Sequence, residues 1–120
     1  MKILIVDDNA SLGAVIRDIL EDDGQKVAYA RDGVEGYEAY LAFQPDLVIT
    51  DIQMPRKSGL EMMRRIRYHN PMIRTIYMSG NIRFYKQALT EEKRRYPVSY
   101  FEKPFLLESL RQAVAGPRFN

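Results

Sequence analysis

Five short runs of aliphatic and aromatic residues recur along the chain, and polar or turn-forming residues bound each of them. The runs cover residues 3–6, 26–30, 47–50, 75–78 and 98–101. Runs of this length that are apolar on both faces are typical of strands buried inside a parallel sheet. The pattern therefore predicts five strands, separated by segments that are each long enough to hold a helix.

The intervening segments carry apolar residues at helical spacing. Gly24 suits the end of the first helix, and Pro45 stops the second. Ser58 and Glu61 have the spacing of a capping box at the start of the third helix, and Gly116-Pro117 ends the last one. Two apolar stripes stand out, one made of Leu12, Val15, Ile16, Ile19 and Leu20, the other of Leu60, Met63 and Ile66.

Two places fit the helical pattern less well. Gly36 lies inside the second helix, where glycine costs about 1 kcal/mol relative to alanine unless close packing against the sheet requires it. The segment 82–96 is rich in charge, and its apolar anchors would be Phe84, Ala88 and Leu89. The sequence pattern for the fourth helix is therefore the weakest of the five.

Alternation of strands and helices predicts an α/β protein with a doubly wound parallel sheet, joined by right-handed crossovers. The chain has 120 residues, enough for one (βα)5 domain, which is expected to occupy residues 1–120. Hydrophobic residues make up 46% and charged residues 28%, with too many polar breaks for a membrane span. The apolar run at 3–6 is too short for a signal peptide, so the cytoplasm is the expected compartment.

Composition narrows the chemistry. The chain has no cysteine and one histidine, which excludes disulfides, thiolate zinc sites, iron–sulfur clusters and catalytic thiols. A bound metal must be held mainly by oxygen, which leaves Mg²⁺, Ca²⁺ or no metal at all. The net charge of +2 is too small for a dedicated nucleic-acid binder. Two basic clusters are interleaved with glutamates and are interpreted as solvated helix surface. They are Arg64, Arg65 and Arg67, and Lys93, Arg94 and Arg95.

Polar residues that could form a chemical site follow four of the predicted strands. Asp7 and Asp8 come directly after the first strand and Asp51 after the third, while Ser79 follows the fourth and Lys103 comes soon after the fifth. In an open parallel sheet, ligands bind beyond the carboxyl ends of the strands. Carboxylates brought together repel one another unless a cation neutralises them, and oxygen ligands in a small hydrated site favour Mg²⁺.

Each of these residues also has an ordinary structural explanation. Consecutive aspartates often cap a helix, and Asp51 before a Met-Pro turn is a favoured turn residue. Ser79-Gly80-Asn81 can be a simple turn, and Lys103-Pro104 a solvated charge before a helix. Their joint occurrence at successive strand ends favours a single functional site, because isolated caps have no reason to complement one another in charge.

Five motifs extend this pattern beyond single residues. They are Val6-Asp7-Asp8-Asn9, the segment PDLVITDIQMP at residues 45–55, Ser58-Gly59-Leu60-Glu61, Met78-Ser79-Gly80-Asn81 and Tyr100-Phe101-Glu102-Lys103-Pro104-Phe105. With them the sequence resembles the receiver domain of two-component response regulators, including chemotaxis receivers, over nearly the whole chain. The resemblance implies the flavodoxin-like strand order 2-1-3-4-5.

The resemblance also implies roles for the residues at the strand ends. Asp51 would accept a phosphoryl group, and Ser79 and Lys103 would hold phosphoryl oxygens. The donor would be a partner histidine kinase or phosphotransfer protein, and the domain would catalyse both its own phosphorylation and the later hydrolysis. The implied Mg²⁺ ligands are Asp8, Asp51 and the main-chain carbonyl of Gln53, with Asp7 acting through a water molecule.

Such a domain would work as a switch. Phosphorylation would draw in the loop after the fourth strand through Ser79 and change the exposure of Tyr100 on the fifth. The surface around the fourth helix, fifth strand and fifth helix would then control a protein partner or an output domain. A phosphorylation-dependent dimer is compatible with the sequence, whereas direct binding to nucleic acid or membrane is not expected.

The sequence departs from the usual pattern at three places. Ser79 replaces a commoner threonine, Tyr37 stands where leucine is usual, and Arg95-Tyr96-Pro97-Val98 replaces a small Gly-Ala pair. An atypical fourth helix and following loop are therefore expected.

Other functions compete with the switch. A haloacid dehalogenase-type phosphatase would need a second aspartate where Gln53 stands. A flavin carrier would need a phosphate-binding loop where Asp7 and Asp8 would repel the phosphate. A pseudo-receiver that binds partners without phosphorylation remains an alternative.

Overall fold

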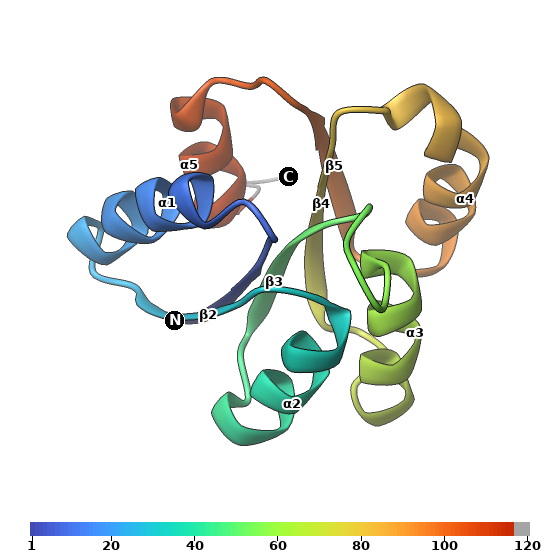
Figure 1. Cartoon of the computed structure of the whole chain (residues 1–120), viewed down its shortest axis with the longest axis horizontal. Coiled ribbons are helices and arrows are strands. Elements are labelled where there is room, and N and C mark those ends of the chain that lie inside the picture. The colour runs from blue at the N-terminus through green and yellow to red at the C-terminus, as the bar shows by residue number, and fades with distance from the viewer. Residues whose placement is uncertain (117–120) are drawn as a thin grey trace.

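Strands and helices alternate along the chain, as Figure 1 shows for the computed structural model, which describes residues 1–116. Within these residues there are five of each. The strands are β1 (Lys2–Val6), β2 (Lys26–Ala30), β3 (Leu47–Asp51), β4 (Arg74–Ser79) and β5 (Val98–Glu102). The helices are α1 (Ala10–Asp22), α2 (Gly33–Phe43), α3 (Gly59–His69), α4 (Ile82–Arg95) and α5 (Leu107–Ala115).

The strands form one parallel sheet in the order β2-β1-β3-β4-β5. Val6 pairs with Ala30 of β2 and with Thr50 of β3, so neighbouring strands end at the same edge. The predicted fold class and strand order are thus confirmed. Each predicted strand is present, and none extends more than one residue beyond either predicted end.

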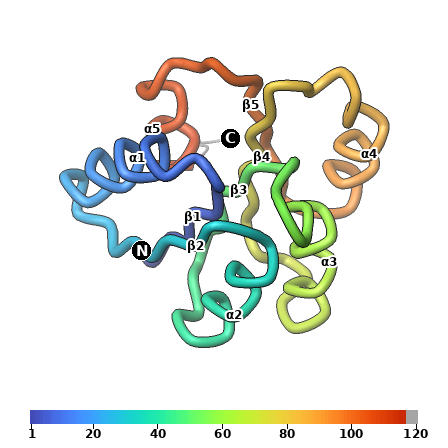
Figure 2. Tube along the Cα trace, viewed as in Figure 1, coloured from blue at the N-terminus to red at the C-terminus, as the bar shows by residue number. Residues whose placement is uncertain are grey.

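Helices cover both faces of the sheet. α1 and α5 lie on one face, and α2, α3 and α4 lie on the other (Figures 1 and 2). In β1, Ile3 and Ile5 pack under the first pair, and Leu4 and Val6 pack under the other three helices. This two-sided burial explains why the strand is apolar without alternation. Among the described residues, no helix has both the length and the apolar character needed to cross a membrane.

The fourth helix is present and regular, although the sequence pattern for it is the weakest of the five. α4 runs without interruption over 14 residues and is anchored by Ile82 and Leu89. The predicted anchors Phe84 and Ala88 were wrong, because Phe84 is 74% exposed and Ala88 is also exposed. Helical periodicity places residues 82, 85 and 89 on one face, and Tyr85 packs against the same core.

Two other side-chain placements differ from the prediction. The interpretation of Arg67 as solvated surface was wrong, because Arg67 is buried on the same face of α3 as Met63 and Ile66. Val15 of the first apolar stripe is exposed, whereas Ile16 and Leu20 are buried. The buried face of α3 therefore includes a charged residue, and that of α1 leaves out one apolar residue of the predicted stripe.

The predicted helix ends are largely confirmed. Gly24 follows α1 with a positive φ of 89°, which suits glycine, and its N–H donates to the carbonyl of Glu21. α2 ends two residues before Pro45. Ser58 and Glu61 form the capping box at the start of α3. Gly116 follows α5, and the predicted Pro117 lies outside the described residues.

Gly36 is in the second helix because the helix packs closely there. A Cβ at this position would lie 2.4 Å from the sulfur of Met62 and 3.1 Å from the methyl groups of Val6. Both distances are too short for an ordinary contact, so only glycine lets α2 approach β1 and α3 this closely. Close packing against the sheet, the condition under which glycine is expected inside this helix, is therefore observed.

Candidate functional site

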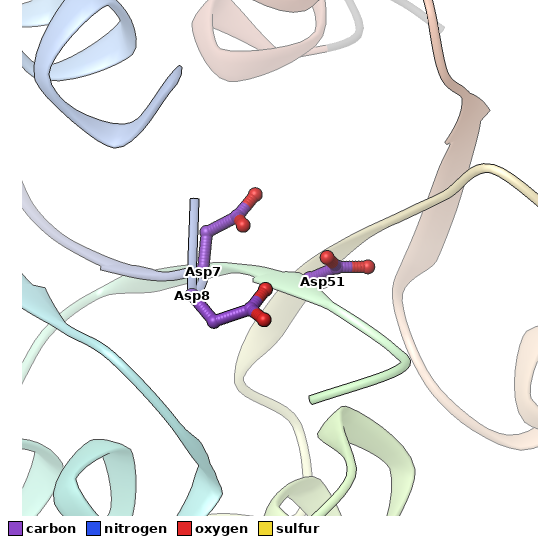
Figure 3. Close-up of side chains that lie close together, drawn as sticks. All are labelled: Asp7, Asp8 and Asp51. Carbon is purple, nitrogen blue, oxygen red and sulfur yellow. The ribbon is translucent and has the colours of Figure 1, made fainter. Parts of the chain in front are cut away.

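Three carboxylates meet at the edge of the sheet where β1 and β3 end. Asp7 follows β1 directly, Asp8 comes next, and Asp51 is the last residue of β3. One carboxylate oxygen from each lies within 4.8 Å of the others, and Figure 3 shows the three side chains gathered there. Asp7 and Asp51 are buried, whereas Asp8 is exposed to solvent. The cluster is therefore buried at Asp7 and Asp51 and open to solvent at Asp8.

Lys103 joins two of these carboxylates. Its Nζ lies 2.9 Å from Oδ2 of Asp7 and 3.1 Å from Oδ2 of Asp51. The lysine follows β5, and its main-chain N–H donates to the carbonyl of Ser79 at the end of β4. The ends of β1, β3, β4 and β5 thus contribute to one site.

Burial and the attraction between Lys103 and the carboxylates shift the pKa values of Asp51 and Lys103 in opposite directions. Burial raises the pKa of Asp51, and the nearby charge of Asp7 raises it further, although Lys103 partly offsets both effects. Burial alone would lower the pKa of Lys103, but its contacts with Asp7 and Asp51 raise it above its ordinary value. The ammonium therefore stays charged at neutral pH, where it compensates for part of the acidic cluster.

The loop after β3 is fixed next to Asp51. Oδ1 of Asp51 accepts the N–H of Ile52 at 2.8 Å, and the hydroxyl of Thr50 donates to the Asp51 carbonyl at 2.7 Å. Gly59 begins α3 so close to this carbonyl that a Cβ would lie 2.2 Å from the oxygen. The Asp51 side chain is thereby held with its second oxygen, Oδ2, toward Lys103.

The two predicted switch residues lie on β4 and β5. Ser79 is buried, and its hydroxyl oxygen accepts the N–H of Asn81 at 2.9 Å in the loop before α4. Tyr100 is half-buried and pairs in register with Tyr77. The ammonium groups of Lys86 and Lys93 on α4 lie 5.7 and 5.4 Å from the centre of its ring. Tyr100 therefore contacts the helix that Ser79 precedes.

Similarity to known proteins agrees with this arrangement. Residues 3–115 match the family described as the response regulator receiver domain. The chain belongs to this family. It is the receiver domain of a two-component response regulator.

Several relatives share this domain. Chemotaxis protein CheY of Listeria monocytogenes is 33% identical over 95% of this chain and 98% of its own length. Sporulation initiation phosphotransferase F of Bacillus subtilis is 28% identical, over 94% of this chain and 90% of its own length. A protein-glutamate methylesterase/protein-glutamine glutaminase of Geobacter metallireducens is 40% identical over 67% of this chain, which spans only 24% of that protein.

A solved structure supports the same assignment. The crystal structure of a response regulator receiver domain protein from Clostridium thermocellum is 30% identical, with a TM-score of 0.82 over 95% of this chain and 90% of the other. Receiver domains act with histidine kinases and output domains, and they generally bind Mg²⁺ at an acidic pocket. The oxygen-only cluster of this receiver domain fits that group.

Sequence reasoning missed some residues that support the site of this receiver domain. Arg56, in the loop after β3, has a positive φ of 68°, and its guanidinium contacts the Asp32 carboxylate at 2.9 Å. The next residue, Lys57, accepts the N–H of Gly33 through its carbonyl at 3.2 Å. These contacts tie the loop that follows Asp51 to the start of α2. Only the capping preference of Asp32 was visible in the sequence.

Proposed function

We propose that this receiver domain is a switch operated by phosphorylation of Asp51. The observation that carries the proposal is the contact of Lys103 Nζ with both Asp7 and Asp51, the two buried members of the acidic cluster. Three carboxylates and one ammonium leave a formal charge of −2 at this edge. A divalent cation would neutralise that charge, which supports Mg²⁺ as the cofactor.

Mg²⁺, when bound, would neutralise negative charge on the transferred phosphoryl group. The residues that would hold it are Asp8, Asp51 and the main-chain carbonyl of Gln53, with Asp7 acting through a water molecule. Asp8 and Gln53 are both exposed, which leaves a route for a cation and a phosphodonor to reach the buried Asp51.

The chain's own groups would carry out the transfer. An oxygen of the ionised Asp51 attacks the phosphorus of a phosphohistidine on the partner kinase or phosphotransfer protein. The P–N bond breaks, and the imidazole leaves with the electron pair and takes up a proton. Lys103 would stabilise the charge on the phosphoryl oxygens, and the Ser79 hydroxyl would donate a hydrogen bond to one of them.

The domain would also reverse its own modification. A water molecule attacks the phosphorus, the P–O bond to Asp51 breaks, and the carboxylate leaves as inorganic phosphate forms. Lys103 would again stabilise the charge on the phosphoryl oxygens in this step. The domain would thus return to its resting state without a second enzyme.

The phosphoryl group would change the α4–β5–α5 surface through Ser79 and Tyr100. In this structure, the Ser79 hydroxyl oxygen accepts the N–H of Asn81, the residue before α4. A new hydrogen bond from this hydroxyl to a phosphoryl oxygen would therefore alter the start of that helix. Tyr100 packs beside α4 and would respond to the shift. A downstream protein target, an output domain or a second phosphorylated copy would recognise the altered surface. The proposed compartment is the cytoplasm.

Intact-mass measurement after incubation with a small phosphodonor and Mg²⁺ tests the acceptor. The wild-type chain should gain one phosphoryl group, and Asp51→Asn should gain none. Asp46→Asn is the matched control, because Asp46 lies at the opposite end of β3 and accepts the N–H of Lys2. If the Asp51 variant still gains the group, the assignment of Asp51 is wrong. If the wild-type chain gains none, the chain is a pseudo-receiver that acts by binding alone.

Amide chemical shifts in the presence of beryllofluoride, a stable mimic of the phosphoryl group, test the switch. Wild-type shifts should change around Asp51 and also across α4, β5 and α5. Ser79→Ala should confine the changes to the site, because the bond from the Ser79 hydroxyl is lost. Ser99→Ala is the control, since Ser99 is exposed on β5. Wild-type changes confined to the site would contradict the relay.

A further inference from the structure

Four polar atoms of Asp7 each form a hydrogen bond, and each bond is with a different residue. Its N–H donates to the carbonyl of Ala30 at 3.1 Å. Its carboxylate accepts the N–H of Asn9 at 2.8 Å through Oδ1 and the ammonium of Lys103 through Oδ2. Its main-chain carbonyl accepts the hydroxyl of Tyr29. Asn9 and Lys103 belong to the receiver motifs, and Ala30 bonds through its main chain. Tyr29, on β2, lies outside those motifs and bonds through its side chain.

The fold makes room for the Tyr29 ring at Gly13 of α1. A Cβ at residue 13 would lie 2.5 Å from Cε1 and 3.0 Å from Cδ1 of Tyr29. Such a contact is too short, so any larger residue at position 13 would displace either the ring or the helix. Gly13 and Tyr29 therefore form a fitted pair, 16 positions apart in the sequence. The pair places the hydroxyl against the Asp7 carbonyl.

The Tyr29 hydroxyl remains a donor at neutral pH. Burial raises the pKa of Tyr29, and the charges of Asp7 and Asp8 raise it further. A carbonyl oxygen can only accept, so the hydrogen bond has one possible direction.

The bonded carbonyl belongs to the peptide that joins Asp7 to Asp8. Because a peptide unit is planar, a hydrogen bond that fixes its oxygen also fixes the position of the Asp8 Cα. The exposed Asp8 carboxylate makes no hydrogen bond or ion pair with any of residues 1–116. Its direction toward Asp51 therefore depends on the backbone before it.

We propose that Tyr29 is a positioning residue for the metal site, which orients the Asp8 carboxylate through its hydrogen bond to the Asp7 carbonyl. The proposal rests on the proposed function, since it concerns the same Mg²⁺ site. It assigns a contribution to a side chain on β2, an edge strand that supplies none of the proposed metal ligands. Partners that orient metal ligands typically change affinity by about 10-fold to 100-fold when they are lost.

A Mg²⁺ titration followed by amide chemical shifts tests the proposal on the folded protein. Tyr29→Phe keeps the ring and removes the hydroxyl, and it should raise the Kd for Mg²⁺ about tenfold. Tyr37→Phe is the matched control, because it also removes a hydroxyl with a hydrogen bond, in this case to His69 on the α2–α3 surface. Its Kd should stay within about twofold of wild type. A Tyr29→Phe Kd within about twofold of wild type would overturn the proposal.

A second substitution separates positioning from a general loss of stability. Gly13→Ala should also weaken Mg²⁺ binding, because the new methyl group displaces the Tyr29 ring. In the Tyr29→Phe background it should add little, since the hydroxyl contact is already gone. Equal losses in both backgrounds would mean that Gly13 acts on the site by another route and would contradict the proposal. If the wild-type chain itself binds no Mg²⁺, the proposed function fails, whatever the variants do.

Discussion

Replacing Arg67 with methionine should destabilise the fold more than most single substitutions. The Arg67 side chain is 4% exposed and forms an ion pair with Glu92 of α4. Another of its N–H groups donates to Thr75 at 3.1 Å, and its guanidinium lies 4.1 Å from the centre of the Tyr96 ring. The Tyr77 hydroxyl donates to the same Glu92 oxygen at 2.7 Å. One buried arginine thus joins α3, β4 and α4.

The magnitude follows from what Arg67→Met leaves behind. Removing one partner of a buried ion pair typically costs about 3–5 kcal/mol, because the other charge stays buried without compensation. Here Glu92 would keep its bond from Tyr77, and its side chain is 15% exposed, so the lower end applies. We expect a loss of about 3 kcal/mol in the free energy of unfolding. That is a large part of the roughly 5–15 kcal/mol by which small domains are stable.

Urea denaturation of four proteins tests this reasoning. They are the wild type, Arg67→Met, Glu92→Leu and the double variant. The double variant should be less destabilised than the sum of the single variants, because neither charge remains buried alone. The buried Nε of Arg67 has no hydrogen-bond partner among the described residues, which further limits what the intact pair contributes. An Arg67→Met loss below about 1 kcal/mol, or strict additivity, would refute the argument.

Three further predictions concern the acidic site and the start of α3. Burial raises the pKa of Asp51 above its usual 3.8, so the ionised carboxylate disfavours the folded state as pH rises. In metal-free buffer Asp51→Asn should therefore have a higher Tm than wild type at neutral pH. This difference in Tm should vanish as the pH falls below 3.8. Equal Tm values at neutral pH would contradict this prediction. Mg²⁺ should stabilise the wild type by about 1.4 kcal/mol at ten times its Kd, and Asp8→Ala should abolish that gain in thermal melts. Ser58→Ala should cost about 1 kcal/mol in urea denaturation, since it removes the cap of α3, whereas Ser58→Thr should cost less.

The site could be predicted from the sequence because it depends on topology. Asp7, Asp51 and Ser79 each come at the end of an apolar run, and a parallel sheet brings such ends to one edge. The order of the strands came from the resemblance rather than from the apolar pattern. The pattern fixes which segments are strands, but it does not say which strands are neighbours.

The supporting contacts could not be predicted in the same way. The partner of Arg67 is Glu92, which lies 25 residues further along the chain on another helix. Residue type alone suggested that both were on the surface, because charged residues are seldom buried unless they are paired. Tyr29 and Gly13 likewise fit together only through the packing of α1 against β2. Pairs of this kind become visible only when the helices are placed on the sheet.

The two ends of α4 are held very differently, and this difference bears on how a signal could leave the site. Near its C-terminus, Glu92 is tied to Arg67 and to Tyr77 of β4. At its N-terminus, Asn81 makes no side-chain cap, and its N–H donates to Ser79. Side chains two residues apart on a strand share a face, so Tyr77 and Ser79 both face the α4 side of the sheet. A change at Ser79 therefore acts on the less restrained end of α4, while the ion pair holds the other end. The first turn of the helix should therefore shift more than the last.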